Sequence, residues 1–165
     1  MIRASHIITV MVVLLILPGM VWGFNTKVTR ETLQGIKGIS VVVEKMGPES
    51  EKAGLTKSQI QTDVEMKLRM TGLNVLTFEE VSKVSGSPWI YVKINIGKTS
   101  HGAYVFNINL ELMQNVYLER YNKRSIASTW SVEYLGITPN LDDIRSKTRS
   151  LVDDFRHAWV SVNLQ

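Results

Sequence analysis

WIYVKINI at residues 89–96 and YVFNINLELM at residues 104–113 decide the fold of this chain, because both alternate apolar and more polar side chains. Successive side chains of a β-strand point to opposite faces of the sheet, so this period of two gives each strand one apolar face. A third alternating stretch at residues 126–134 follows a turn at Asn122 and Lys123. The three stretches predict antiparallel strands that are buried on one side only.

Two helices are predicted from their end signals. Thr56 and Gln59 stand three apart, as in a capping box, and Gly72 supplies the left-handed residue that ends a helix near residue 71. The apolar stripe of this helix repeats at helical spacing through Ile60, Val64 and Leu68. Asn140 is a favourable N-cap for the last helix. Asp143–Lys147 and Arg149–Asp153 are expected there as exposed ion pairs.

Further strands are predicted at Ile39–Glu44 and Leu73–Phe78, with loops at Met46–Gly54 and Glu79–Ser87. The element order is then β-α-β-β-β-β-α. We expect an α+β fold, a two-layer sandwich in which two helices cover one face of a mainly antiparallel sheet of about five strands. The opposite face is left to water or to a partner. Its polar residues are Lys93, Asn95, Asn107, Asn109 and Glu111.

The amino terminus has the layout of a secretory signal peptide: a short polar start, an apolar run at residues 7–17, and small residues near Gly23. The sequence therefore predicts a signal peptide at 1–23, a polar leader at 24–38 and one domain at 39–165. We expect an exported protein, periplasmic or secreted after cleavage near Gly23. The alternative is retention as an inner-membrane anchor, in which case membrane contact occurs only through this segment.

Composition indicates one globular domain and argues against nucleic-acid binding. Apolar residues make up 44% of the chain and charged residues 21%. The first 23 residues hold Arg3 and no acid, so the remaining 142 residues carry 18 basic and 15 acidic side chains, a net charge of +3. The basic residues alternate with acids instead of clustering. The chain has no cysteine, which excludes disulfides, cysteine nucleophiles and a lipidated cysteine.

The sequence contains no catalytic, metal or cofactor signature. Beyond residue 23 only His101 and His157 are histidines, and no Gly-x-Ser-x-Gly motif accompanies them. No group of histidines and acids has the spacing of metal ligands. We therefore expect a protein that is not an enzyme and needs no cofactor, and we rank a hydrolase without a recognisable motif last.

Several segments resemble small exported bacterial proteins that have no assigned activity. The matching segments are Ala53-Gly54-Leu55-Thr56, Val64-Glu65, Leu68-Arg69, Gly72-Leu73-Asn74-Val75-Leu76 and Thr129-Trp130-Ser131-Val132. The element order is also similar, more loosely, to cell-envelope helper domains, namely the amino-terminal domain of the Tol–Pal periplasmic component and the lipopolysaccharide-assembly lipoprotein. This chain departs from the latter because it lacks the lipidated cysteine. The resemblance implies a helper role in the envelope, although a fold does not fix a function.

The leading hypothesis is a non-enzymatic binding or scaffold protein of the bacterial cell envelope that acts through protein–protein contacts, with another envelope protein as its partner. Aromatic side chains and methionine are enriched at such interfaces. The candidate contact patch lies on odd-numbered strand positions, at Trp89, Tyr91, Met113, Tyr117 and Tyr121. The alternative hypothesis is a small-ligand or lipid carrier with a pocket between helices and sheet. Its expected lining is Phe106, Leu110, Trp130 and Trp159.

Overall fold

The structure is a computed structural model that describes residues 21–52 and 54–164. Its strands are β1 (Val21–Trp22), β2 (Gly38–Val43), β3 (Asn74–Val75), β4 (Trp89–Lys98), β5 (Tyr104–Leu118) and β6 (Lys123–Thr138). Its helices are α2 (Lys27–Glu31), α3 (Pro48–Lys52), α4 (Lys57–Arg69), α5 (Phe78–Val81), the 3₁₀ turn η1 (Glu119–Tyr121) and α6 (Leu141–Asn163).

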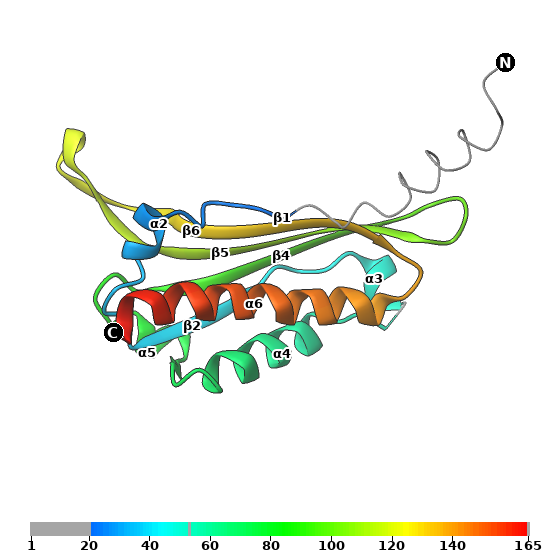
Figure 1. The fold of residues 1–165 in the computed structure, drawn as a ribbon, viewed down its shortest axis with the longest axis horizontal. Coiled ribbons are helices and arrows are strands. Elements are labelled where there is room, and N and C mark those ends of the chain that lie inside the picture. Colours follow the sequence, from blue (N-terminus) through cyan, green and yellow to red (C-terminus); the bar gives the residue numbers. More distant parts are fainter. Residues whose placement is uncertain (1–20, 53, 165) are drawn as a thin grey trace, which may run out of the picture.

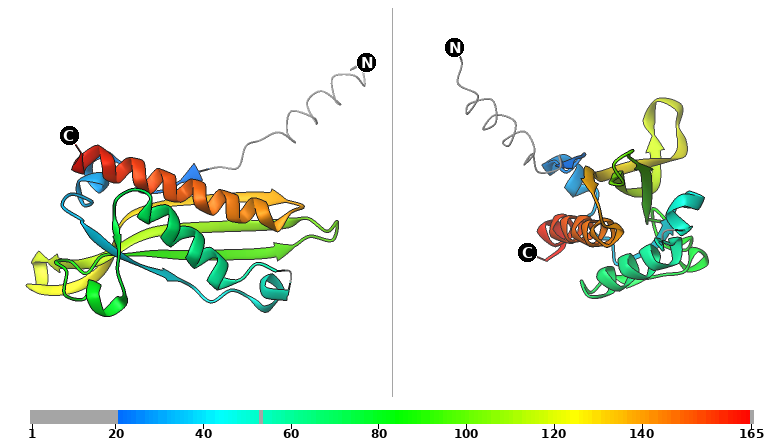
Figure 2. Two further views of the ribbon diagram at one scale, coloured as in Figure 1. Left: turned by 90° about the horizontal axis from the view of Figure 1, so that it is seen from below. Right: turned by 90° about the vertical axis from the view of Figure 1, so that its right-hand side faces the viewer.

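The strands form one mixed sheet in the order β1-β6-β5-β4-β2-β3. Neighbours among β4, β5, β6 and β1 pair antiparallel, whereas β2 runs parallel to both β3 and β4. Helices α4 and α6 lie side by side beneath one face of the sheet (Figures 1 and 2). The predicted α+β two-layer sandwich is therefore confirmed.

The hydrophobic core lies between the sheet and these two helices. The even-numbered side chains of β4 and β5 point into it, as the alternation predicts, and the core includes Ile90, Val92, Ile108, Leu110 and Leu112. The buried stripes of α4 and α6 form the other half of this core. Those stripes contain Ile60, Val64, Leu68, Ile144, Leu151, Phe155 and Trp159.

The predicted ends of the long helices are confirmed. The Thr56 hydroxyl accepts from the Gln59 amide while the Gln59 side chain accepts from the Thr56 amide, which completes the capping box of α4. Gly72 has the left-handed φ of 87° that was expected after this helix. The Asn140 side chain accepts from the Asp142 amide and caps α6.

Two segments differ from the sequence prediction. The strand expected at Leu73–Phe78 is limited to Asn74–Val75, because Thr77 starts α5 through its own capping box with Glu80. The segment expected as a loop at Met46–Gly54 contains the single-turn helix α3. Both short helices raise the helix content without changing the two-layer arrangement.

The amino-terminal segment packs on the domain. The signal-peptide prediction falls mostly on residues 1–20, which lie outside the described residues, whereas Val21 and Trp22 pair with β6. The leader at 24–38 contains α2 and places Leu33 and Ile36 in the core. Among the described residues, no helix combines the length and apolar character needed to cross a membrane.

Candidate functional site

The most prominent surface feature is a two-stranded arm at one end of the sheet. β4 begins at Trp89, which pairs with Met113, so the later part of β5 pairs only with β6. We call residues 114–127 the arm. It projects from the body of the molecule beyond the end of α6 (Figure 1).

The arm is set at an angle by a bulge at its root. Leu112 pairs with Trp130 but Met113 pairs with Ser128, so Thr129 has no cross-strand partner. The Gln114 side chain donates to the Thr129 hydroxyl at 2.7 Å and to the Thr32 carbonyl at 3.1 Å. Gln114 thus bridges the bulged strand and the segment that follows α2. The predicted turn at Asn122 is confirmed, since Asn122 has the left-handed φ of 50° that asparagine tolerates.

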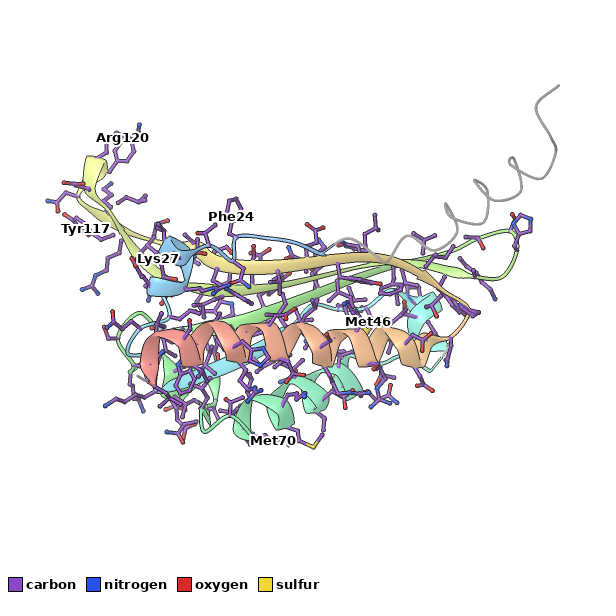
Figure 3. All side chains as sticks on the ribbon, viewed as in Figure 1. Phe24, Lys27, Met46, Met70, Tyr117 and Arg120 are labelled. Carbon is purple, nitrogen blue, oxygen red and sulfur yellow. The ribbon has the colours of Figure 1, made fainter. Side chains whose placement is uncertain are left out.

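The arm exposes large apolar side chains that this chain does not cover. Tyr117, Leu118, Tyr121 and Ile126 keep 59%, 44%, 62% and 56% of their surface exposed. The arm also carries Glu119 and three basic residues, Arg120, Lys123 and Arg124. The Arg120 guanidinium lies 4.7 Å from the centre of the Tyr121 ring, a cation–π distance. Figure 3 shows Arg120 at the tip and Tyr117 nearer the root.

The predicted contact patch divides into two parts. Trp89 and Met113 are half-buried cross-strand partners, and Tyr91 is half-buried on the same face of β4. Tyr117 and Tyr121 are exposed on the arm. The structure therefore places two of the five predicted residues where a partner can bury them fully, and three where they already contribute to the sheet.

Polar contacts link the centre of the sheet face that the helices leave open. The Tyr91 hydroxyl donates to Glu44 at 2.7 Å, and the Lys93 ammonium lies 3.5 Å from the same carboxylate. The hydrogen bond from Tyr91 lowers the pKa of Glu44 and Lys93 lowers it further, while the bond to Glu44 raises the pKa of Tyr91. These contacts join β2 to β4.

Similar contacts continue across β5 and β6. Asn107 donates to Glu133 at 2.6 Å, and Asn109 donates to Glu111 at 2.5 Å. The polar face predicted from the sequence is thus cross-linked within the chain. Beyond this polar centre, at the end opposite the arm, the same face exposes Val105, Leu135 and Ile137.

The residues expected to line a carrier pocket belong to the hydrophobic core. Leu110 and Trp130 are fully buried, and the Trp130 ring meets Phe155 edge-on at 5.3 Å. The Trp159 indole donates to the Ile36 carbonyl at 2.9 Å. Phe106 lies beside Tyr134 with ring centres 5.7 Å apart. Leu110, Trp130 and Trp159 are therefore core residues, whereas Phe106 also lines a recess of about 430 Å³ between the end of β6 and the first turns of α6.

The two histidines of the described residues, His101 and His157, lie at opposite ends of the domain. His101 is in the β4–β5 hairpin, where its ring contacts the neighbouring Ser100, and His157 is near the end of α6, where it contacts Arg156. Neither has a hydrogen bond to an acidic side chain within the described ranges. In residues 21–52 and 54–164, no three histidine or acidic side chains gather as metal ligands would.

Comparisons with known proteins identify no family for this chain. No family model matches it, and no curated protein matches it. Among solved structures, a single-residue variant of the PelC dodecamer from Paraburkholderia phytofirmans is 13% identical over 84% of this chain and 98% of that one, with a TM-score of 0.49. A second structure of the PelC dodecamer from the same organism is 12% identical over 88% and 96%, with a TM-score of 0.47.

A minor lipoprotein from Acinetobacter baumannii is 8% identical over 74% of this chain and 87% of that one, with a TM-score of 0.28. These likenesses concern the arrangement of the backbone. The resemblance to the two named helper domains therefore stays a prediction.

A charged cluster that local sequence patterns did not predict lies between the helices α4 and α6. Asp63 is buried on α4 and accepts from Arg145 at 2.9 and 3.1 Å and from Arg149 at 3.1 Å. The pair expected between Arg149 and Asp153 does not form, because Arg149 pairs with Asp63 and Asp153 with Lys67. The pair expected between Asp143 and Lys147 does not form either: Asp143 accepts from the Thr138 hydroxyl, and Lys147 lies over the Tyr134 ring. A signal was present in the sequence, since Asp63 lies at the edge of the apolar stripe of α4. The cluster clamps α4 to α6.

Proposed function

We propose that this chain is an exported, non-enzymatic binding or scaffold protein of the bacterial cell envelope that acts through protein–protein contacts, with the arm as its main contact element. The observation that carries the proposal is the exposure of Tyr117, Leu118, Tyr121 and Ile126 on a ribbon of only two strands. Export is supported by the signal-peptide pattern of the first 23 residues.

The physical argument starts from the composition of the arm. A two-stranded ribbon has no second layer, and isolated hairpins are marginally stable in water. Single exposed apolar residues are ordinary, but the arm exposes four of them, with Tyr117 and Ile126 on one face and Leu118 on the other, so it gains from a partner that covers it. Burying one leucine or isoleucine side chain fully is worth about 1.5–3 kcal/mol. When a partner protein covers the arm, this burial contributes favourably to the free energy of binding.

The residue types favour a protein partner. Tyrosine and arginine are enriched among the few residues that dominate binding energy at protein interfaces. Tyr117 and Tyr121 combine an apolar ring with a hydroxyl, and Arg120 already stacks on Tyr121. We therefore narrow the contact residues from the five predicted positions to Tyr117 and Tyr121, with Leu118 and Ile126 beside them.

The test is site-specific crosslinking in the native bacterium. A photoreactive amino acid replaces Tyr117, or in a separate strain Ile137, which is equally exposed at the other end of the open face. We expect one discrete crosslinked species from position 117 and none of the same mass from position 137.

A double variant completes the test. Tyr121→Ser with Ile126→Ser should abolish the crosslink from position 117 and leave the melting temperature unchanged, because both side chains lie outside the core. Leu135→Ser with Ile137→Ser is the matched control and should preserve the crosslink. An unchanged crosslink in the arm double variant, or no crosslink at all, contradicts the proposal.

A further inference from the structure

A recess of about 560 Å³ lies where the arm leaves the sheet. Its walls are the loop after α5, Ser82–Ser87, and the arm residues Asn115, Tyr117 and Arg124. We call it the root recess. The Asn115 amide donates to the Gly86 carbonyl at 2.7 Å, and the Ser87 amide donates to the Val84 carbonyl at 2.9 Å. These bonds fix the loop against the arm, so the two walls are held in place.

The charged side chains that line the root recess are both cationic. They are Lys83 from the loop and Arg124 from β6, and no carboxylate lines the recess with them. Lys83 forms one ion pair, 3.6 Å to Glu79, between two strongly exposed side chains, and its charge also helps to lower the pKa of Glu80 after the hydrogen bonds from Thr77. Such a surface pair contributes about 0–1 kcal/mol and gives way readily to another anion. Among the described residues, Arg124 has no ion pair.

Neutral hydrogen-bonding groups accompany the two cations. Ser85 and the side-chain amide of Asn115 are exposed and have no hydrogen bond to the described part of the chain. The Ser82 hydroxyl, in contrast, already donates to the Glu79 carbonyl at 2.6 Å. The guanidinium of Arg124 can donate two parallel hydrogen bonds to one oxyanion, and such charge-assisted bonds are the strong ones.

We propose that the root recess binds a phosphate-class oxyanion through Lys83, Arg124 and the neutral donors beside them. Two cations with no acid between them match a group that carries nearly two negative charges and several acceptor oxygens. The oxyanion is either free inorganic phosphate or the phosphate of a lipid headgroup. This inference goes beyond the proposed partner contact and does not rest on it.

The first experiment is a titration of the ¹⁵N-labelled full-length protein with inorganic phosphate, at constant ionic strength maintained with sodium chloride. We expect saturable shifts of the amide signals of Ser85, Gly86 and Asn115, with a Kd on the order of 1 mM. Arg124→Gln and, separately, Lys83→Gln should each weaken binding at least tenfold. Both residues are exposed, and the amide spectrum itself shows that each variant is folded.

The matched control is Arg120→Gln, which removes the same charge from the arm tip, outside the root recess. It should leave the phosphate affinity unchanged. Equal weakening by Arg120→Gln and Arg124→Gln would mean general electrostatic attraction and would overturn the proposal. Shifts that do not saturate, or that chloride alone reproduces, would overturn it as well.

Vesicles identify the source of the oxyanion once the phosphate titration has saturated. Sedimentation with phosphatidic acid vesicles, with Arg124→Gln in parallel, assigns the site to a lipid headgroup if the unchanged protein sediments and the variant does not. Phosphatidylcholine vesicles control for general membrane binding. If neither protein sediments with either vesicle, the site takes a soluble phosphate.

Discussion

Asp63 shows how one charged residue joins two elements. Asp63 is only 6% exposed, and its carboxylate receives three hydrogen bonds from Arg145 and Arg149. Asp63→Asn keeps the shape but presents an amide to two guanidinium groups. We expect the free energy of unfolding to fall by about 1.5–3 kcal/mol, the range for hydrogen bonds to charged groups. Urea denaturation measures this change.

Glu65→Gln is the matched control for that experiment, because Glu65 lies on the same helix and pairs with Arg69 at the surface. Removal of such an i,i+4 pair should cost about 0.2–0.5 kcal/mol. Equal effects of the two substitutions would mean that the Asp63 cluster does not hold α4 to α6.

Asp154 gives a prediction with a defined pH dependence. Burial raises the pKa of this carboxyl above its ordinary value of 3.8, although Lys147 and His157 partly oppose the shift. The folded state therefore favours protonated Asp154. Its contribution to stability is fully present below pH 3.8 and is lost as the pH rises through the higher folded-state pKa.

Asp154→Asn should accordingly raise the melting temperature at pH 7 and change it little at pH 3. Asp142→Asn serves as the control, because Asp142 lies in the first turn of α6, where negative charge is favourable. That control should lower the melting temperature at pH 7. A lower melting temperature for Asp154→Asn at pH 7 would show that its environment does not penalise the charge.

At the scale of elements, the capping box of α4 fixes where the helix begins. The Thr56 hydroxyl accepts the Gln59 amide at 3.3 Å, and Thr56→Ala leaves this amide without a side-chain acceptor. We expect a loss of about 1 kcal/mol in the free energy of unfolding. Thermal denaturation with Thr62→Ala as control tests this, since Thr62 is exposed within the same helix and alanine is the better helix former. If Thr62→Ala lowers the free energy of unfolding as much as Thr56→Ala does, the cap at Thr56 does not stabilise α4.

The sequence predicted those elements that carry a strong local signal. Alternation located β4, β5 and β6, and the caps at Thr56 and Asn140 located α4 and α6. Thr77 and Glu80 also form a capping pattern, but the apolar run into Phe78 favoured a strand. A helix of four residues depends on its surroundings more than on its propensity.

The sequence predicted the two strands and the turn that form the arm, but it did not predict that they project from the rest of the sheet. The alternation of β5 continues past Met113 without a break in the sequence, and this part of β5 projects only because its partner strand β4 begins at Trp89. Periodicity alone therefore could not show that the side chains of Tyr117 and Tyr121 are exposed. In the same way, the ion pairs of Asp63 join residues more than 80 positions apart. The spacing of residues within one helix or strand does not predict such pairs.

At the scale of the whole molecule, the amino-terminal segment belongs to the folded body. Leu33 and Ile36 are buried, and the Ile36 carbonyl satisfies the indole N–H of Trp159. A chain that begins at Gly38 loses both side chains from the core, at about 1.5–3 kcal/mol each, and leaves that indole without its partner. A typical domain is stable by only about 5–15 kcal/mol.

We therefore expect the chain that begins at Gly38 to lose most of its cooperative unfolding transition in urea, as followed by tryptophan fluorescence. A chain that begins at Phe24 is the control and should unfold cooperatively, because it keeps α2 and the turn that follows. Equal midpoints for the two chains would mean that residues 24–37 are dispensable for the fold.

The bond between Gly35 and Asn163 also has a consequence for the timing of folding. The Gly35 amide donates to the Asn163 side chain at 2.7 Å across 128 residues of sequence. Synthesis proceeds at about 5–20 residues per second, so the first segment waits for about 6–26 s before the last turn of α6 exists. The fold cannot close around its amino terminus until translation is nearly finished.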